Sequence, residues 1–438
     1  MRKRIARTLV AAALTLTAAG GAQAAGFNIY EAGARATALG CAFTATADDG
    51  SALFYNAAGL SFMQGQSVEF NIMPVGPKFK FAEAEDMGGD PATGEAVDKY
   101  YPVPGVYYTR NTGGRTSFGV GVYAPFGLGV EWQDGDTFVG RQANYDVGIE
   151  TAYITPAVSF MAAEGLALAL GLDIASQHIS LERMTLDPTT GGNAIDTKIE
   201  GRSSLNVTPS FGAMYRPNEQ VSFGLMYHWK KTMKYEDRDA TLRNVGAAGT
   251  PSASFAGALL SGLGGSASQL DATIDSELNL PWIMSLGASY WVTTDLRGEV
   301  NYVRYGWSNF KELALDFDVD ALDQSLHFDY EDSWQIRFGL EYVASEALDL
   351  MVGYVHDKTP QPLASVSPIL PDSDRNDYSF GLRWKTTRWD FIGSYMVVVG
   401  SERTNIEDGQ PVRNSTTYPV GSYKSVANIF ALGVGYHF

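Results

Sequence analysis

The chain has 438 residues, with 49 acidic against 32 basic side chains and a formal net charge of −17. This acidic excess argues against a nucleic-acid partner, because binding phosphates needs a basic face. The single cysteine, Cys41, excludes an intramolecular disulfide, and we interpret it as a small buried residue.

Residues 1–24 predict a cleaved signal peptide. Basic residues at positions 2, 3, 4 and 7 precede an apolar run over residues 8–19. Ala22 and Ala24 then fit the small-residue cleavage rule, so we expect the mature chain to begin at Ala25. A first transmembrane helix is the alternative, but the run is shorter than the ~20 residues that cross a bilayer.

Residues 25–62 are rich in alanine and glycine and show no strand-like alternation. We expect two short helices here, over residues 32–39 and 51–60. If a closed barrel follows, this segment either hangs free or folds into the lumen. A free tail would carry more charge, so the composition favours a plug, or hatch, inside the barrel.

From about Gln66 onward, apolar and polar residues alternate with a period of two, which is the signature of β-strands with one apolar face. In residues 221–230, for example, the odd positions are apolar, and we place Ser222, Gly224, Met226, His228 and Lys230 on the inner face. Connections alternate between short and long, and the runs between them number about fourteen. Residues 63–438 therefore predict an all-β fold, a transmembrane antiparallel barrel with short periplasmic turns and long outer loops. The long loops are expected at residues 76–101, 133–148, 185–201, 243–275, 315–329, 359–375 and 405–425.

The last strand ends at the chain terminus, with apolar residues at alternate positions up to Phe438. A terminal aromatic on such a strand resembles the signal read by the barrel assembly machinery of the Gram-negative outer membrane. The alternative is a strand that merely stops at phenylalanine. We expect this machinery, outer-membrane lipid and lipopolysaccharide to be partners.

Five stretches, taken together and in this order, resemble the FadL family of outer-membrane transporters for long-chain fatty acids and hydrocarbons. The resemblance spans the mature chain nearly end to end, although Ala57 stands where the family's plug signature has proline. It implies a fourteen-stranded barrel with an N-terminal hatch, passive uptake of hydrophobic molecules, a sideways exit at a kink in the third strand, and a monomer. The stretches are residues 25–31, 47–60, 123–128, 307–310 and 370–375.

Two of these stretches supply candidate site residues. Pro125 cannot donate a ladder hydrogen bond and Gly127 tolerates unusual backbone angles, so Tyr123, Pro125, Phe126 and Gly127 are the candidates for the lateral-exit kink. An ordinary bulge without a transport role is the alternative. The hatch candidates, which either gate the channel or only plug it, are Phe54, Tyr55, Asn56, Ala57 and Ala58.

Binding of a hydrophobic ligand suggests two further groups of candidate residues. An apolar stripe in the loop over residues 243–275 is a candidate capture surface or, alternatively, a helix packed over the barrel mouth. Arg183 resembles the family's basic residue for a fatty-acid carboxylate, which wants a buried cation. The family's second basic residue has no evident match; His327, among acidic neighbours, is the nearest candidate, and this leaves neutral hydrocarbons open as ligands. The stripe consists of Phe255, Leu259, Leu260 and Leu263.

Enzymatic activity is not expected. The five histidines lie in no recognisable nucleophile motif, and the sequence has no metal-ligand cluster, phosphate loop or cofactor signature. A general diffusion porin for polar solutes is the leading alternative, and a barrel phospholipase is the third. A porin would lack the hatch of residues 25–62.

Overall fold

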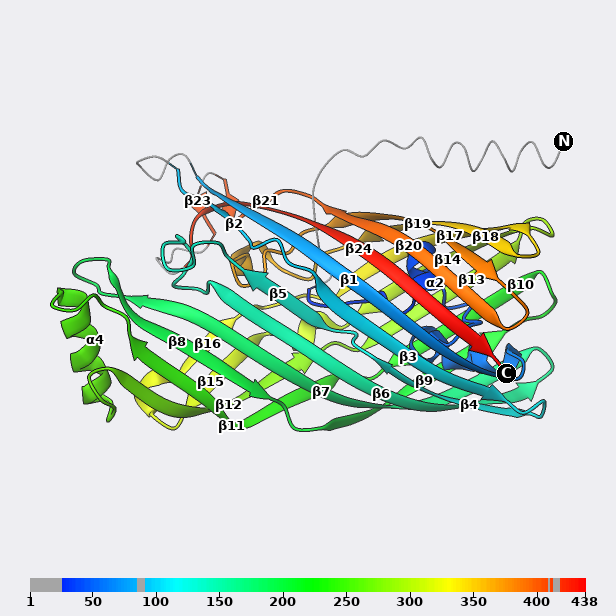
Figure 1. Ribbon diagram of the computed structural model, residues 1–438, viewed down its shortest axis with the longest axis horizontal. Helices are drawn as coiled ribbons and strands as arrows, with labels where there is room; N and C mark the ends of the chain where they lie inside the picture. The colour runs from blue at the N-terminus through cyan, green and yellow to red at the C-terminus, as the bar shows by residue number, and fades with distance from the viewer. Residues whose placement is uncertain (1–25, 85–90, 409, 413–417) are drawn as a thin grey trace.

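In the computed structural model, residues 26–84, 91–408, 410–412 and 418–438 are described, so the predicted signal peptide lies outside the described residues. The chain forms a long antiparallel barrel with helical segments inside it and at one end (Figure 1). Every helix of the described residues is too short or too polar to cross a membrane. The helical segments are α2 (Ala34–Ala38), α3 (Ala52–Tyr55), η1 (Ala57–Phe62), α4 (Pro251–Gly262), η3 (Trp307–Asn309), η4 (Asp320–Leu322) and η5 (Leu363–Ser365).

The strands follow from the alternation in the sequence: in β10, for example, Ser222, Gly224 and Met226 are buried while Phe223 and Leu225 are exposed. The strands are β1 (Gln66–Glu83), β2 (Thr93–Glu95), β3 (Tyr101–Asn111), β4 (Thr116–Tyr123), β5 (Gly127–Glu131), β6 (Asp146–Ala163), β7 (Leu166–Leu186), β8 (Asn193–Arg202), β9 (Asn206–Tyr215), β10 (Val221–His228), β11 (Lys231–Asn244), β12 (Gln269–Leu280), β13 (Ile283–Trp291), β14 (Leu296–Tyr305), β15 (Glu312–Phe317), β16 (Gln324–His327), β17 (Ser333–Ser345), β18 (Leu348–Asp357), β19 (Arg375–Lys385), β20 (Trp389–Gly400), β21 (Arg403–Thr404), β22 (Ile406–Glu407), β23 (Gln410–Pro411) and β24 (Gly421–His437).

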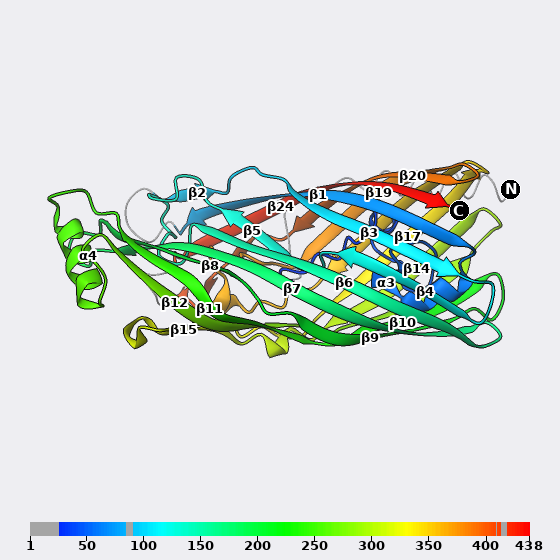
Figure 2. The same ribbon diagram turned by 60° about the horizontal axis from the view of Figure 1, so that its bottom comes forward.

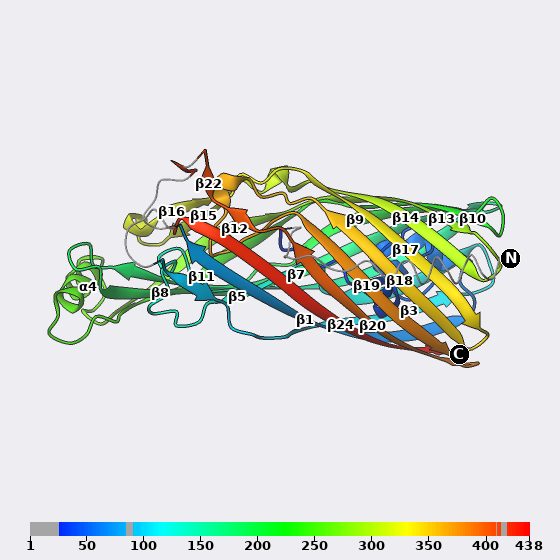
Figure 3. The ribbon, with the colours of Figure 1, turned by 90° about the horizontal axis from the view of Figure 1, so that it is seen from above.

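The barrel closes between its first and last strands, where β1 pairs with β24 from Ser67↔His437 to Glu83↔Gly421. Eight of its passes consist of two consecutive strands, such as β4 with β5 and β10 with β11, and six are single strands. The described residues therefore make fourteen passes, which confirms the number predicted from the connections. Figure 3 shows the strands tilted around one closed wall.

The outer face of the barrel carries apolar side chains toward the end where the C-terminus lies. Leu432 is 61% exposed and Phe380 is 56% exposed, and similar residues project from β4, β7 and β10. Such a belt is the surface that lipid covers in an outer-membrane barrel. The strands continue well past it on the other side, and α4 caps that far end (Figure 1).

Several of the predicted long loops are wrong in part because they contain strand. β1 continues to Glu83, β7 to Leu186, and β8, β15 and β16 also fall in segments interpreted as loops. These extensions lie beyond the apolar belt. Both faces of each strand have polar surroundings there, so the alternation of apolar and polar residues weakens. The inward position predicted for Lys230 is also wrong: β10 ends at His228 and β11 begins at Lys231, so Lys230 is exposed and Lys231 is buried.

Residues 26–62 occupy the lumen near the C-terminal end of the barrel, where α2 and α3 lie inside the wall (Figure 2). All five residues of α2 are buried, as are all four of α3. The side chain of Asn56 holds the turn into η1, because it accepts from Ala58 N at 3.2 Å and donates to the carbonyls of Thr44 and Ala213 at 2.9 and 3.0 Å. We call this segment the hatch.

Candidate functional site

The wall of the barrel has a gap at its third pass. β4 ends at Tyr123 and β5 begins at Gly127, and both pair with β6. On the other side the ladder with β3 ends at Val106↔Val122, and pairing resumes only at the bridge Ala96↔Trp132. Between these points residues 98–105 face residues 123–130 without a ladder pair. Pro125, which has no N–H to donate, lies at the break.

The beginning of the hatch fills this break from inside. Asn28 forms an antiparallel bridge with Phe126, Ile29 N donates to Pro125 O at 2.8 Å, and Gly127 N donates to Phe27 O at 2.9 Å. Gly127 is not in the left-handed region, so unusual backbone angles are not its role. A Cβ there would lie 2.6 Å from Ile29 Cδ1, so a larger residue would require the Ile29 side chain to shift.

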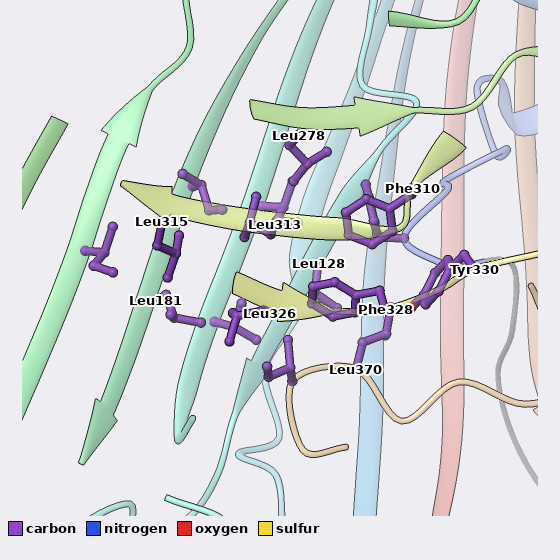
Figure 4. Close-up of a pocket in the computed structure, with 16 residues that line it drawn as sticks. Leu128, Leu181, Leu278, Phe310, Leu313, Leu315, Leu326, Phe328, Tyr330 and Leu370 are labelled. Atoms are coloured by element: carbon purple, nitrogen blue, oxygen red, sulfur yellow. The ribbon is translucent and has the colours of Figure 1, made fainter. Parts of the chain in front are cut away.

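An apolar pocket with a cavity volume of about 50 Å³ lies next to the break. Figure 4 shows the side chains of β15 and β16 facing those of β5, β7 and the segment before β19. Every lining residue is apolar except for the hydroxyl of Tyr330. The lining residues are Phe27, Leu128, Val147, Ile149, Ile179, Leu181, Ile199, Leu278, Phe310, Leu313, Leu315, Leu326, Phe328, Tyr330, Ile369 and Leu370.

Arg183 lies on β7 two residues beyond Leu181, so both side chains are on the inner face of the strand. Among the described residues it makes no ion pair, and its buried Nε has no hydrogen-bond partner. Arg183 therefore offers an unpaired N–H donor, Nε, near one end of the apolar pocket. His327 stands between Leu326 and Phe328 of the pocket lining, but its side chain is exposed and its Nδ1 lies 3.6 Å from Glu312 Oε2.

The stripe in the loop between β11 and β12 forms most of one face of α4. Leu260 is fully buried with Ala256 against β8, β11 and β12, and Phe255 and Leu263 pack beside them, while Leu259 is exposed. None of the four lines the apolar pocket. The structure thus places this stripe in a cluster of its own at the far end of the barrel.

Among the remaining hatch candidates, Phe54 packs next to the break, and the others pack within the hatch or against β6. The Phe54 ring packs edge-on against Tyr123 with 5.4 Å between centroids, and it stacks on His228 at 5.7 Å. Tyr55 is buried and its hydroxyl donates to Tyr30 O at 2.6 Å. Ala58 O accepts from Ser159 Oγ at 3.2 Å, and Ala57 begins η1, where a proline would also be tolerated.

The loop between β18 and β19 closes the pocket from outside and is tied to the start of the hatch. Asp372 is buried there, and its Oδ2 accepts from Gly26 N at 3.0 Å and from Thr359 Oγ1 at 2.6 Å. Burial raises the pKa of Asp372 to about 6, despite these two donors. Ile369 and Leu370 of the same loop line the pocket, so we expect the protonation of Asp372 to change how firmly this loop covers the pocket.

We expect this loop to be held more tightly in acid than at neutral pH. The pKa of Asp372 is higher in the folded state than its ordinary value of 3.8, so the folded state binds the proton more tightly. The stabilisation is complete below about pH 4, is lost as pH rises through about 6, and amounts to at most ~3 kcal/mol. Hydrogen exchange of residues 358–374, corrected for intrinsic rates, should be slower at pH 4.5 than at pH 7. In D372N this difference should disappear; an undiminished difference would contradict the assignment.

The fold and the site together define a plugged membrane barrel, closed by its own N-terminal segment and holding an apolar pocket beside a wall gap. Residues 15–438 match the family described as "Outer membrane protein transport protein (OMPP1/FadL/TodX)", and the chain belongs to this family of the outer membrane. This confirms the resemblance, the fold class and the location predicted from the sequence.

Individual relatives agree with this assignment. The chain is similar to outer membrane protein P1 of Haemophilus influenzae, with 24% identity and 100% of both chains covered. The crystal structure of a Pseudomonas aeruginosa FadL homologue matches with a TM-score of 0.76 and 20% identity, covering 95% of this chain and 100% of the other. The P. putida toluene transporter TodX matches with a TM-score of 0.70 and 15% identity, covering 93% and 98%. At these identities the two structures establish the fold alone.

Sequence reasoning missed most of the pocket and a buried charged group beside the break. The pocket is lined by side chains from strands that are far apart in the chain. In the sequence of its own strand, each of these residues looks like any other inward-facing residue. Lys231 was not singled out, because the interruption between β10 and β11 puts Lys231, and not Lys230, on the inner face. No cluster of three or more potential metal ligands occurs among the residues that the structure describes.

Proposed function

We propose that this protein carries hydrophobic molecules passively across the outer membrane and releases them sideways into the lipid. The observation that carries the proposal is that the apolar pocket adjoins the wall gap: Phe27 of the hatch and Leu128 of β5 belong to both. A hydrophobic molecule loses favourable surroundings if it enters the aqueous periplasm, whereas a wall gap leads it to hydrocarbon. A general porin is not favoured, because the hatch fills the lumen.

The ligand class that we propose is a long-chain carboxylic acid. Its hydrocarbon tail suits a pocket lined almost wholly by aliphatic and aromatic side chains, and Arg183, with its unpartnered Nε, supplies a charge-assisted hydrogen bond to the carboxylate. The exposed stripe residue Leu259 on α4 remains a candidate for first contact with ligand. In the same way Phe438, which is 69% exposed, remains the candidate for recognition by the assembly machinery.

Cross-linking the hatch into the break should stop uptake. Asn28 and Phe126 are antiparallel bridge partners, and such partners have Cα separations that a disulfide can span. In N28C/F126C, made in a C41A background, oxidation should reduce the uptake of radiolabelled oleate into cells to that of cells lacking the protein. Reduction should restore uptake, and the two single-cysteine variants should be insensitive to oxidant. If the oxidised double variant takes up oleate normally, the ligand does not pass this gap.

A further inference from the structure

A second, smaller pocket lies behind the break on the side of the hatch helix α3. It brings together aromatic rings and two basic side chains from four different passes of the barrel and from the hatch. Its lining includes Pro125 and Phe126 of the break itself, so any molecule that leaves through the gap passes it. The lining residues are Phe54, Tyr123, Pro125, Phe126, Tyr153, His228, Lys231, Pro281 and Ile283.

One carboxylate serves both basic groups in this pocket. Asp173 is fully buried, and its Oδ2 lies 2.7 Å from His228 Nδ1 and 3.0 Å from Lys231 Nζ. Its Oδ1 accepts from Thr155 Oγ1 at 3.0 Å. The other ring nitrogen of His228, Nε2, lies 3.0 Å from Phe54 O of the hatch. One buried carboxylate is thus shared by a histidine and a lysine that both line the pocket.

The pocket also has a buried hydrogen-bond donor without an acceptor. The hydroxyl of Tyr153 is buried and has no hydrogen-bond partner among the described residues. Lys231 has three N–H groups, of which Asp173 and Trp229 O, at 3.3 Å, occupy two. Its Nζ lies over the Tyr153 ring, 4.9 Å from the ring centre, so the ammonium and this tyrosine are neighbours. A buried unpaired donor is costly, so the Tyr153 hydroxyl calls for an acceptor.

We propose that Lys231 and Tyr153 form a second carboxylate-binding position, which receives the head group of a long-chain acid as its tail enters the wall gap. The inference rests on the proposed sideways exit. A carboxylate that leaves Arg183 for an apolar path loses its partner, and an unpaired charge in such surroundings is strongly disfavoured. The ammonium of Lys231 and the phenol of Tyr153 replace that partner at the gap, while the rings of Phe54 and Phe126 surround the adjoining methylene groups.

The test compares an acid with a neutral ligand of similar size. Oleate and the hydrocarbon 1-octadecene are offered separately to vesicles that contain the purified protein, and initial uptake rates are measured. Tyr153→Phe removes only the unpartnered hydroxyl. Lys231→Met combined with Asp173→Asn removes the ammonium and leaves the net charge of the site unchanged, because one positive and one negative group are lost together. Tyr235→Phe is the matched control, because this buried hydroxyl on β11 lies outside both pockets and is already bonded to Gln177 Oε1 at 2.7 Å.

We expect oleate uptake to fall by about tenfold in Y153F, in keeping with the loss of one hydrogen bond to a charged group, and further in K231M/D173N. The uptake of octadecene should stay within about twofold of the wild-type rate in every variant, since burial of hydrocarbon does not depend on these donors. Undiminished oleate uptake in Y153F, or equal losses for oleate and octadecene, would overturn the proposal. Failure of the sideways exit itself would appear differently, as uptake of both ligands by oxidised N28C/F126C.

Discussion

Replacing Gly353 with leucine is expected to push the hatch off the barrel wall and make the lumen leak small polar solutes. Gly353 lies on the inner side of β18, directly against the turn that follows α2. A Cβ at this position would lie 1.9 Å from Gly40 N and 2.2 Å from the carbonyl carbon of Leu39. These are backbone atoms, which cannot rotate away, so the cost exceeds the ~1–3 kcal/mol of ordinary overpacking.

The measurement is the swelling rate of vesicles in solutions of small sugars. We expect wild-type protein to give slow swelling and G353L to give swelling several times faster, with the barrel still folded because its lipid-facing surface is unchanged. Gly393→Leu is the control, since a Cβ at Gly393 would have no atom within 4 Å. A G353L protein that swells vesicles no faster than G393L would show that the hatch tolerates displacement without opening a path.

The barrel was predictable because its signals are local and repeated. Alternation within one strand, as from Val221 to His228, reports which side chains face lipid, and no distant residue is needed to read it. The number of passes then follows from the connections. The outer extensions were less predictable, because beyond the lipid belt the requirement for an apolar outer face disappears and strands such as β8 and β16 resemble loops.

The site was predictable only where one residue carries a backbone constraint. Pro125 marks the break because it cannot donate a ladder hydrogen bond. The inward position of Lys231 depends instead on a two-residue interruption between β10 and β11. The role of Tyr153 depends on the absence of a hydrogen-bond acceptor near its hydroxyl in the folded chain. No pattern in the sequence indicates either feature. The same holds for the pairing of Asn28 with Phe126, which joins segments almost a hundred residues apart.

The hatch has two kinds of attachment, and they differ in strength. At the break it is held by backbone hydrogen bonds of Phe27 and Ile29, which a ligand in the adjoining pocket can compete for. On the opposite side it is held by buried charges: Arg35 Nη2 lies 2.9 Å from Glu341 Oε1 of β17, and Asp48 Oδ2 of the hatch lies 3.2 Å from Arg297 Nη1 of β14. A hatch fixed by ion pairs on one side can yield at the other without leaving the barrel.

Arg35→Met should therefore loosen the hatch far more than it affects the barrel. Arg35 and Arg297 both pair with Asp48 and Glu341, so removing Arg35 leaves two carboxylates facing one guanidinium. Arg35 and Glu341 are each only 4% exposed, and breaking a buried pair from one side costs ~3–5 kcal/mol. Hydrogen exchange of residues 26–62 should then accelerate on the order of a hundredfold or more, given local opening in rapid equilibrium.

The control is Lys424→Met, which removes an exposed ion pair of 3.0 Å between Lys424 and Glu402. Such a surface pair contributes at most about 1 kcal/mol, so hatch exchange should be nearly unchanged. R35M should also raise oleate uptake at low ligand concentration, because a looser hatch vacates the break more readily. If R35M exchanges no faster than K424M, the charges around Glu341 do not anchor the hatch. The backbone bonds at Phe27 and Ile29 would then be its main attachment rather than its weak side.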